Sequence, residues 1–218
     1  VGQDGDDDLN GGGGGDAIFG DAGIDTLSYV HDSAGVDIRL FAGTASGGEA
    51  AGDSYSSIEN VTGGRGGDYI AGNSAANVLT GNDGNDQLRG GSSDDVLDGG
   101  FASDILFGHG GADRFNFTSN LGVVDSIMDF ASADGDKIGL DDAIFTALAT
   151  AGSTAGTPLA GAEFVVGAVA TTAAHRIVYN DATGALSYDA DGSGSGAAVH
   201  FANFAGMPTL SAADIFVI

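Results

Sequence analysis

Glycine recurs at nine-residue intervals in two stretches of the chain, and this repeat limits the possible folds more than any other feature. Aligned on glycine, residues 2–28 hold three consecutive units and residues 63–116 hold six. Position six of each unit is Asp, except for Asn77. Position eight is always a large apolar residue: Leu9, Ile18, Leu27, Ile70, Leu79, Leu88, Leu97, Leu106 and Phe115. Because a flexible linker has no reason to keep an apolar residue in register, these stretches are structural repeats.

Each unit divides into a turn and a short strand. The first six positions are mostly Gly, Asn, Asp and Ser, which suit tight turns with positive φ. The last three surround the apolar side chain, which a strand would point inward. One apolar residue in nine cannot form a core alone, and glycine costs about 0.5–1 kcal/mol relative to alanine in a regular element. Stability therefore requires stacking of the units and a contribution from outside the chain.

The acidic residues indicate what that contribution is. There are 31 Asp and Glu against 6 Lys and Arg, a formal net charge of -25, and all but three of the acids are Asp. This charge argues against nucleic acid as a partner, because phosphate binding is driven by lysine and arginine. Short carboxylates on glycine-rich turns, with carbonyls free to turn inward, suit calcium. The chain has no cysteine for disulfides or thiolate metal sites, and no apolar run long enough for a membrane span.

Stacking would bring the position-six side chains together. If two units complete one coil, turns on the same edge belong to units i and i+2 and lie about 4.8 Å apart. The expected pairs are Asp7 with Asp25, Asp68 with Asp86, Asp86 with Asp104, Asn77 with Asp95, and Asp95 with Asp113. Two carboxylates at that spacing repel by about 3.5 kcal/mol at an effective dielectric of 20. A divalent ion between them would turn this repulsion into attraction. We therefore expect an array that is disordered without calcium and folds on binding it.

The units resemble the GGxGxDxUx nonapeptide of the repeats-in-toxin (RTX) family. The resemblance implies an all-β fold, a right-handed parallel β-roll in which each unit gives one calcium-binding turn and one strand. It also implies several calcium ions, held by position-six side chains and by backbone carbonyls. The expected position-six ligands are Asp7, Asp16, Asp25, Asp68, Asn77, Asp86, Asp95, Asp104 and Asp113. The expected ligands at positions two and four are Gly64, Gly66, Asn73, Asn82, Gly84, Gly91, Gly100, His109 and Gly111.

The turns are not equal in this pattern. Asp68 and Asp86 join two units that match the motif fully. The unit between them has Ala at position four and Asn77 at position six, so we expect its site to be the weakest. Ser93 and Ala102 also replace glycine at position four, which affects the geometry of those turns but not their carboxylates.

Residues 29–62 interrupt the repeat without becoming unstructured. Apolar and polar residues alternate, as in strands, at 26–30, 36–40 and 56–61. The stretch also resembles the spacer between blocks of secreted RTX proteins, which implies wider coils of the same roll. We expect its acids to be solvated rather than liganded: Asp32, Asp37 and Asp53.

A region of different character begins after residue 116. Its segment 124–145 resembles the one that closes the roll in serralysin metalloproteases, which implies a cap. Asp129 and Asp136 could add a terminal ion, although turn-forming acids explain them as well. The segment 141–149 predicts one short helix, with acids suited to its amino end.

The rest of this region predicts antiparallel strands that would cover the open end of the roll. Residues 176–179 and 185–188 form the expected hairpin, and a third strand follows. Residues 189–194, DADGSG, fit an EF-hand loop only in part, because position twelve is His200 rather than Glu, so a plain turn is favoured. The last residues, LSAADIFVI, resemble the uncleaved carboxyl-terminal signal of type I secretion substrates, and a final β-strand explains them as well.

The sequence thus predicts a first repeat block at 1–28, spacer coils at 29–62, a second block at 63–116 and a capping region at 117–218. Neither HExxH nor GxSxG occurs, so we expect no catalytic activity in these residues. Because Val1 holds the last position of what looks like an earlier unit, we expect a carboxyl-terminal piece of a larger secreted bacterial protein. The expected partners are calcium ions, the type I secretion machinery and an upstream domain.

A different class of function is a surface or matrix module, an adhesin or part of a surface layer, in which the roll binds acidic polysaccharide through bridging calcium or packs into a surface lattice. Such a face would carry aromatic or basic residues in a line along the roll. Arg65, Arg89 and Arg114 hold positions three, nine and seven of their units, so they form no single row.

Overall fold

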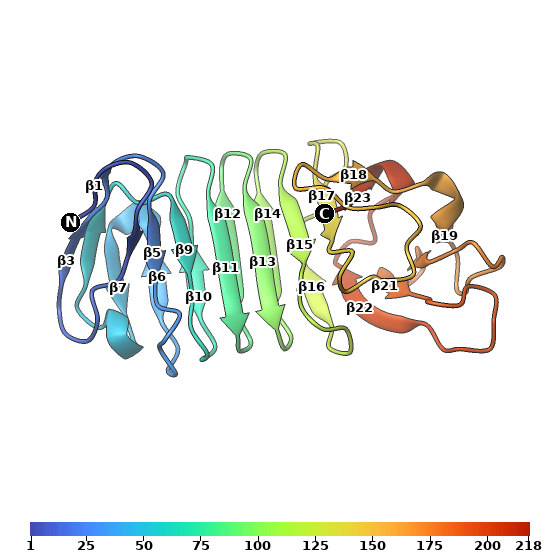
Figure 1. Cartoon of the computed structure of the whole chain (residues 1–218), viewed down its shortest axis with the longest axis horizontal. Coiled ribbons are helices and arrows are strands. Elements are labelled where there is room, and N and C mark those ends of the chain that lie inside the picture. Colours follow the sequence, from blue (N-terminus) through green and yellow to red (C-terminus); the bar gives the residue numbers. More distant parts are fainter.

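Two long β-sheets enclose one apolar core in an elongated molecule, and the computed structural model describes all 218 residues (Figure 1). The first sheet has the order β19 (Phe164–Val166), β20 (Ile177–Asn180), β21 (Ala185–Tyr188), β22 (Val199–Phe204), β16 (Asp125–Ile127), β14 (Ile105–His109), β12 (Gln87–Gly91), β10 (Tyr69–Ala71), β6 (Asp37–Arg39), β7 (Thr44–Ser46), β8 (Ser54–Ser56) and β3 (Ala17–Phe19). The second has the order β18 (Thr157–Pro158), β23 (Ile215–Val217), β17 (Lys137–Leu140), β15 (Arg114–Phe117), β13 (Val96–Phe101), β11 (Val78–Asp83), β9 (Asn60–Thr62), β5 (Thr26–Ser28) and β2 (Asp8–Leu9).

The remaining elements are short. β1 (Gln3–Asp4) pairs with β4 (Asp21–Ala22) in a two-stranded sheet. The helical elements are four 3₁₀ turns: η1 (Leu40–Ala42), η2 (Gly48–Ala50), η3 (Gly161–Glu163) and η4 (Ala212–Asp214). No helix is long and apolar enough to cross a membrane.

The nine-residue units form the predicted parallel roll, with two units to each coil. Consecutive units alternate between the sheets, so Ile70 pairs with Leu88 and Leu88 with Leu106 in one sheet. Leu79 pairs with Leu97 in the other sheet. These side chains are fully buried, and each is worth about 1.5–3 kcal/mol relative to exposure. One apolar residue per unit therefore builds a continuous core only because the coils stack.

The spacer continues both sheets, but not with parallel strands throughout. β5 pairs directly with β9 in the second sheet, whereas β7 runs antiparallel to β6 and β8 in the first. The predicted strand at 56–61 is wrong, because β8 ends at Ser56 and β9 begins at Asn60. Ser57 between them has φ 54°, a left-handed conformation that turns the chain toward the other sheet. Ile58 is buried at this corner.

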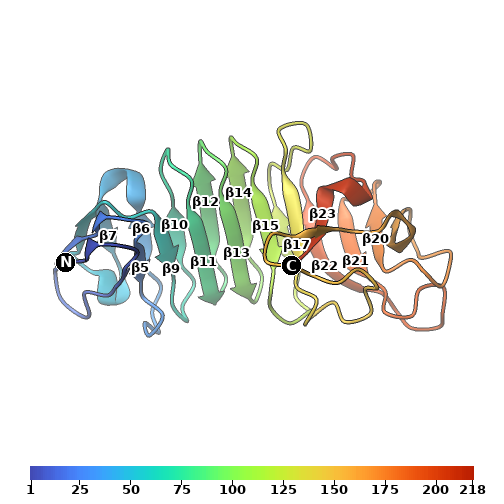
Figure 2. The same cartoon turned by 45° about the horizontal axis from the view of Figure 1, so that its top comes forward.

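The capping region extends the first sheet and closes the core. β20 and β21 form the predicted antiparallel hairpin, and β22 adds the third strand. β22 then pairs parallel with β16, so the cap continues the sheet as well as covering its end (Figure 2). Edge-to-face aromatic contacts fill the end of the roll, with ring centroids 5.0 Å apart for Phe117 and Phe201 and 5.1 Å apart for Phe145 and Phe201.

The predicted helix at 141–149 is wrong, because the segment forms consecutive turns. Within the segment, backbone hydrogen bonds close only single turns, on the carbonyls of Asp141 and Phe145. Other N–H groups bond to the cap. The Ala147 N–H donates to the Tyr188 hydroxyl, at 2.6 Å, and the Ala149 N–H donates to the Glu163 carboxylate, at 2.6 Å. Burial of Phe145 in the aromatic cluster fixes this path.

Candidate metal centre

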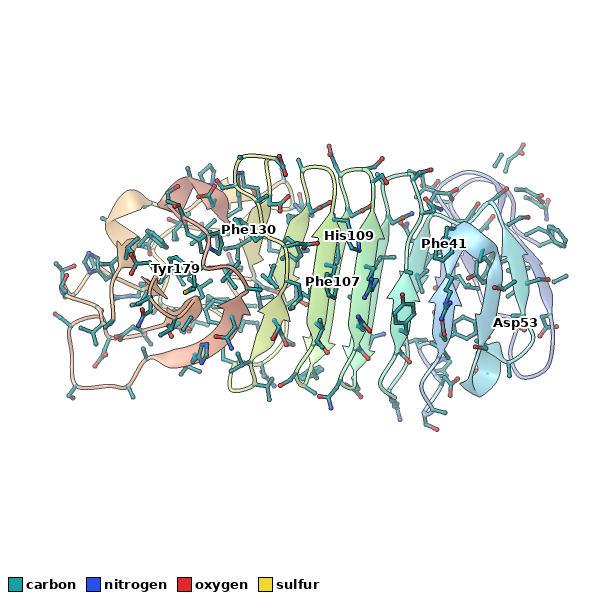
Figure 3. All side chains as sticks on the ribbon, turned by 180° about the vertical axis from the view of Figure 1, so that it is seen from behind. Phe41, Asp53, Phe107, His109, Phe130 and Tyr179 are labelled. Carbon is teal, nitrogen blue, oxygen red and sulfur yellow. The ribbon has the colours of Figure 1, made fainter.

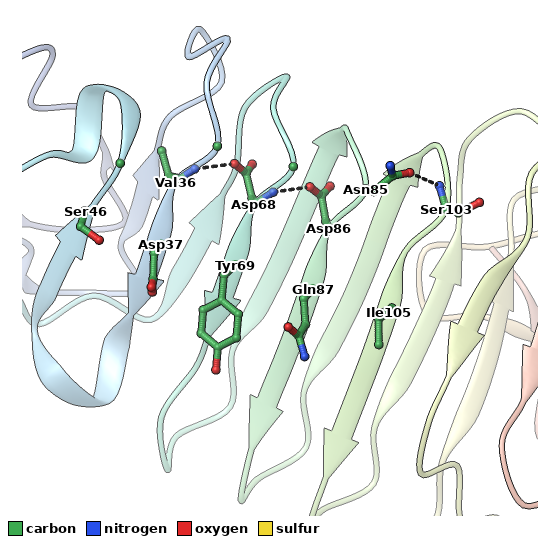
Figure 4. Close-up of a pocket in the computed structure, with 13 residues that line it drawn as sticks. Val36, Asp37, Ser46, Asp68, Tyr69, Asn85, Asp86, Gln87, Ser103 and Ile105 are labelled. Atoms are coloured by element: carbon green, nitrogen blue, oxygen red, sulfur yellow. Dashed lines mark hydrogen bonds between the residues drawn. The ribbon is translucent and has the colours of Figure 1, made fainter.

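The position-six side chains form a ladder along each edge of the roll. Five of the carboxylates use Oδ1 to accept the backbone N–H of the position-six residue two units earlier, and Figure 4 shows the link from Asp68 to Asp86. The donor–acceptor distances are 2.9 Å for Asp7 to Asp25, 2.7 Å for Asp68 to Asp86, 2.8 Å for Asp86 to Asp104, 2.8 Å for Asn77 to Asp95 and 2.9 Å for Asp95 to Asp113. The structure therefore brings together every pair that the stacking argument predicts.

Acids outside the repeats extend the ladder, and the sequence analysis missed this role. The added acceptors are Asp53 for the Asp16 N–H, Glu59 for Asp25, Asp125 for Asp104 and Asp136 for Asp113. A signal was present, because each of these acids is followed two residues later by a buried apolar residue, as in Asp125–Ile127. The acid-x-apolar end of the unit persists where its glycines are lost.

Two of the three spacer acids are buried, so the expectation that they are solvated is wrong for Asp32 and Asp53. Asp53 accepts the Asp16 N–H at 2.8 Å and the Tyr29 hydroxyl at 2.7 Å. Asp32 accepts the Ala34 and Glu49 N–H groups, at 2.8 Å and 2.5 Å. The antiparallel insertion around β7 covers these positions, which a simple wider coil would leave open. Asp37 is partly exposed and pairs with Arg39 at 2.8 Å.

The second carboxylate oxygen of most position-six residues lacks any partner. Oδ2 is buried without a hydrogen bond in Asp7, Asp25, Asp86, Asp95, Asp104 and Asp113. In each of these turns the oxygen faces the position-one glycine of its own unit; at Gly81, a Cβ atom would collide with Oδ2 of Asp86 and lie 2.5 Å from the Gly99 carbonyl oxygen. An orphaned buried carboxylate oxygen is costly, so this space suits a cation rather than a larger side chain.

Backbone carbonyls at positions two and four also stack along the edges. The Asn82 carbonyl faces Gly100, and the Gly66 carbonyl faces Gly84, so closely that a Cβ at either glycine would collide with the oxygen. The same relation holds for the Asn73 carbonyl with Gly91 and the Ser93 carbonyl with Gly111. Positive φ occurs in this set at Asn82, Gly84, Gly91, Gly100, His109 and Gly111, as turns of this kind require.

Gly64 and His109 complete the set of predicted backbone positions. The Gly64 N–H donates to Oδ2 of Asp68 at 2.7 Å, which gives this carboxylate the partner that most others lack. His109 lies in β14 opposite Gly91, and its ring stacks on Phe107 with centroids 5.6 Å apart. Asn77 uses its amide differently from the aspartates, because Nδ2 donates to the Glu59 carbonyl at 2.5 Å.

The carboxylate and carbonyl oxygens of these turns fit a hard cation held mainly by backbone oxygen. No three Asp, Glu or His side chains converge on one point. An ion in these turns would therefore have a stacked pair of carboxylates and neighbouring carbonyls as its ligands. Calcium accepts six to eight such oxygens in flexible geometry, whereas magnesium demands a regular octahedron and zinc prefers nitrogen or sulfur.

Burial raises the pKa of these carboxyls well above the ordinary range of Asp, and neighbouring acids raise it further. The pKa rises to about 8 for Asp86, to about 7 for Asp95 and Asp125, and to about 6 for Asp104 and Asp113. Desolvation is the largest cause in each case. Repulsion between stacked carboxylates, which the repeat pattern predicts, makes a smaller contribution than desolvation. Ionised carboxylates here destabilise the fold unless a cation compensates them.

Asp129 and Asp136 of the capping region have ordinary hydrogen-bond partners. Asp136 accepts the Asp113 and Ala131 N–H groups, at 2.9 Å and 2.8 Å. Asp129 accepts the Gly108 and His109 N–H groups, so a terminal ion at Asp129 and Asp136 stays a prediction. The segment 189–194 is a run of bends, in which Asp191 accepts the Gly196 N–H at 2.9 Å.

Comparison with known families gives a match on the two repeat blocks. Residues 1–27, 62–97 and 89–118 match the family described as the RTX calcium-binding nonapeptide repeat (4 copies). No curated protein matches the chain.

Proposed function

We propose that this chain is a module that folds when calcium enters its stacked turns, because its two repeat blocks match the RTX calcium-binding nonapeptide repeat. The observation that carries the proposal is the row of buried Oδ2 atoms without partners. The ligands would be the position-six side chains and the carbonyls of positions two and four. Each ion would supply the missing partner for the orphaned oxygens of its turn, so binding would be folding energy.

Calcium concentration would then control when the module folds. Extracellular modules bind calcium in about the 10⁻⁴–10⁻³ M range, between the levels inside and outside a cell. In the bacterial cytosol the chain would stay extended and exportable. Outside, it would fold, assist an upstream domain of the same parent chain to fold, and prevent return.

The position of the last strand supports this order of events. The proposed type I secretion signal lies at the end of the chain, where Ile215 and Val217 of β23 are fully buried and pair with β17. Asp214 is also buried, with a carboxylate that accepts bonds from Ser132 and Ser211. A secretion receptor could not read these side chains in the folded protein. The signal would therefore have to be read before calcium folds the roll.

A calcium titration followed by far-UV circular dichroism tests the proposal. We expect a disordered spectrum in excess chelator and a cooperative gain of β structure, with a midpoint in about the 10⁻⁴–10⁻³ M range. Magnesium at the same concentration serves as the control and should not produce the transition. The same β content in chelator and in calcium would overturn the proposal.

A further inference from the structure

A row of stacked π-systems and cations crosses the outer face of the first sheet. The Arg39 guanidinium lies 5.2 Å from the centroid of the Tyr69 ring, and the Arg89 guanidinium lies 5.8 Å from Tyr69 and 4.5 Å from Phe107. Phe107 stacks in turn on His109. Figure 3 views this face, with Phe107 and His109 labelled on the sheet. Strand register produces the row, because Ala71 pairs with both Arg39 and Arg89, and Arg89 pairs with Phe107.

Arg89 is the member of this row that lacks a partner. Arg39 forms two hydrogen bonds with Asp37, each at 2.8 Å. Arg89 makes no ion pair and no side-chain hydrogen bond, although the chain carries 31 acidic residues, and its Nε is buried without a partner. Two aromatic rings hold the guanidinium, which reduces the entropy lost when it binds a ligand. A fixed, unpaired guanidinium is suited to bidentate binding of a carboxylate.

A groove of about 840 Å³ lies beside this arginine. Phe41 forms part of its wall and is 67% exposed, an unusual position for a large aromatic side chain. Tyr69 and His109 of the row also line the groove, and Asn73, Ser74 and Ser92 add amide and hydroxyl groups. An aromatic wall, short polar groups and one guanidinium together match a sugar ring that carries hydroxyl groups and a carboxylate.

We infer that this groove binds a glycan containing uronic acid, with a carboxylate on Arg89 and a sugar ring against Phe41. The contact is direct and does not pass through a bridging calcium ion. The formal net charge of -25 opposes a peptide and a glycan of equal charge to the same extent. The amide and hydroxyl groups of the lining favour the glycan, because they can bond to its hydroxyl groups. The inference needs only that the roll is folded, so it is independent of how calcium drives folding.

Binding of a hexamer of galacturonic acid to the full chain tests the inference. The titration is made by isothermal calorimetry at one fixed millimolar free calcium concentration, after circular dichroism has shown each variant to be folded. We expect binding by the parent chain, at least a tenfold loss in Arg89→Gln, an intermediate loss in Arg89→Lys and a severalfold loss in Phe41→Ala. Arg65→Gln is the matched control, because Arg65 is exposed on a turn and its replacement removes the same charge; its affinity should change less than twofold.

Four results would overturn the inference. Absence of binding by the folded parent chain excludes a glycan site of this chemistry. Equal affinity of Arg89→Gln and the parent chain would assign the binding to calcium bridging at the turns. Equal or tighter binding of a hexamer of aspartate would identify an acidic peptide as the occupant, and a neutral glucan hexamer that binds equally would remove the role of the carboxylate. A chain already folded in chelator would contradict the proposed function but would leave this binding comparison valid.

Discussion

Replacing Asp86 with Asn should have opposite effects on the calcium-free and the calcium-loaded protein. The side-chain oxygen of the new asparagine could still accept the Asp68 N–H, as Oδ1 of Asp86 does at 2.7 Å. Its amide could donate to a carbonyl across the stack, as Asn77 does to Glu59. What changes is the charge of a buried group with one orphaned oxygen.

The magnitude follows from the pKa of this carboxyl. Burial raises the pKa of Asp86 from 3.8 to about 8. A folded pKa above the unfolded value gives stability that is present below the unfolded pKa and is lost as the pH rises to the folded pKa. At pH 7 the cost of burying Asp86 in the calcium-free fold is on the order of 4 kcal/mol, at about 1.36 kcal/mol per unit. Asn avoids this cost, so Asp86→Asn should stabilise the ion-free fold by up to about this amount.

With calcium present the variant should be less stable than the parent chain, because it would lack a charged ligand in the two stacked sites that residue 86 is proposed to share. We expect its calcium midpoint to rise severalfold and its transition to broaden. Far-UV circular dichroism measures both effects. Stabilisation of the ion-free fold is followed in chelator as a stabilising osmolyte, which favours the compact state, is added. The weaker response to calcium is followed in a calcium titration.

The control for this variant is Asp83→Asn, which removes the same charge from an exposed residue of the same unit. It should change both measurements much less than Asp86→Asn does, because the charge of Asp83 makes only the smallest of the contributions that raise the pKa of Asp86. If Asp86→Asn needs as much osmolyte as the parent chain, or if its calcium midpoint equals that of Asp83→Asn, the reasoning from buried ionisation is wrong.

Further predictions concern pH and the glycines of the turns. Between pH 8 and pH 4 the chelated protein should gain β structure as the pH falls, because the buried carboxyls, with a pKa of about 8 for Asp86, become neutral in the fold. The calcium midpoint should rise over the same range. Circular dichroism measures both effects, and a chelated protein that loses structure on acidification would contradict the predicted direction. Gly81→Ala should destabilise the loaded roll by about 1–3 kcal/mol in thermal unfolding, because its Cβ collides with Oδ2 of Asp86; Gly110→Ala, whose Cβ meets nothing within 4 Å, is the control, and equal losses would refute the crowding. Ala102→Gly should stabilise the loaded protein by about 1 kcal/mol, because Ala102 has φ 78°. Ser93→Gly restores the same motif position without relieving a positive φ, so it should give no gain in melting temperature.

The nine-residue period predicts the roll because the same short separation along the chain sets every contact between neighbouring coils. A fixed separation of two units decides that Asp68 meets Asp86 and that Ile70 meets Leu88. The core positions follow in the same way, since position eight is the only apolar position that recurs. The ligand roles of these turns stay a prediction.

Regions without the period depend on tertiary contacts that the sequence does not display. The helical pattern at 141–149 gives only single turns, because the Ala147 and Ala149 N–H groups bond to side chains of distant segments in place of carbonyls one turn earlier. Burial of Asp32 and Asp53 depends on an antiparallel insertion at β7. Local alternation of apolar and polar residues cannot distinguish such a hairpin from a wider coil.

The row of aromatic rings and cations on the outer face of the first sheet was not predicted, for a related reason. The sequence comparison placed the arginines of the repeats at different positions, and they do form no common row. Arg39 belongs to the spacer, and only the pairing of β6 with β10 brings it beside Tyr69 and into line with Arg89. A row of this kind appears only when register across an irregular segment is known.

The central claim is that calcium in the turns holds the repeat blocks together. Hydrogen exchange followed by mass spectrometry, on the same chain in calcium and in chelator, tests it most directly because it separates the repeats from the cap. The account predicts that peptides covering residues 63–116 are strongly protected in calcium and exchange at the rate of unfolded chain in chelator. Retained protection of these peptides in chelator would contradict it.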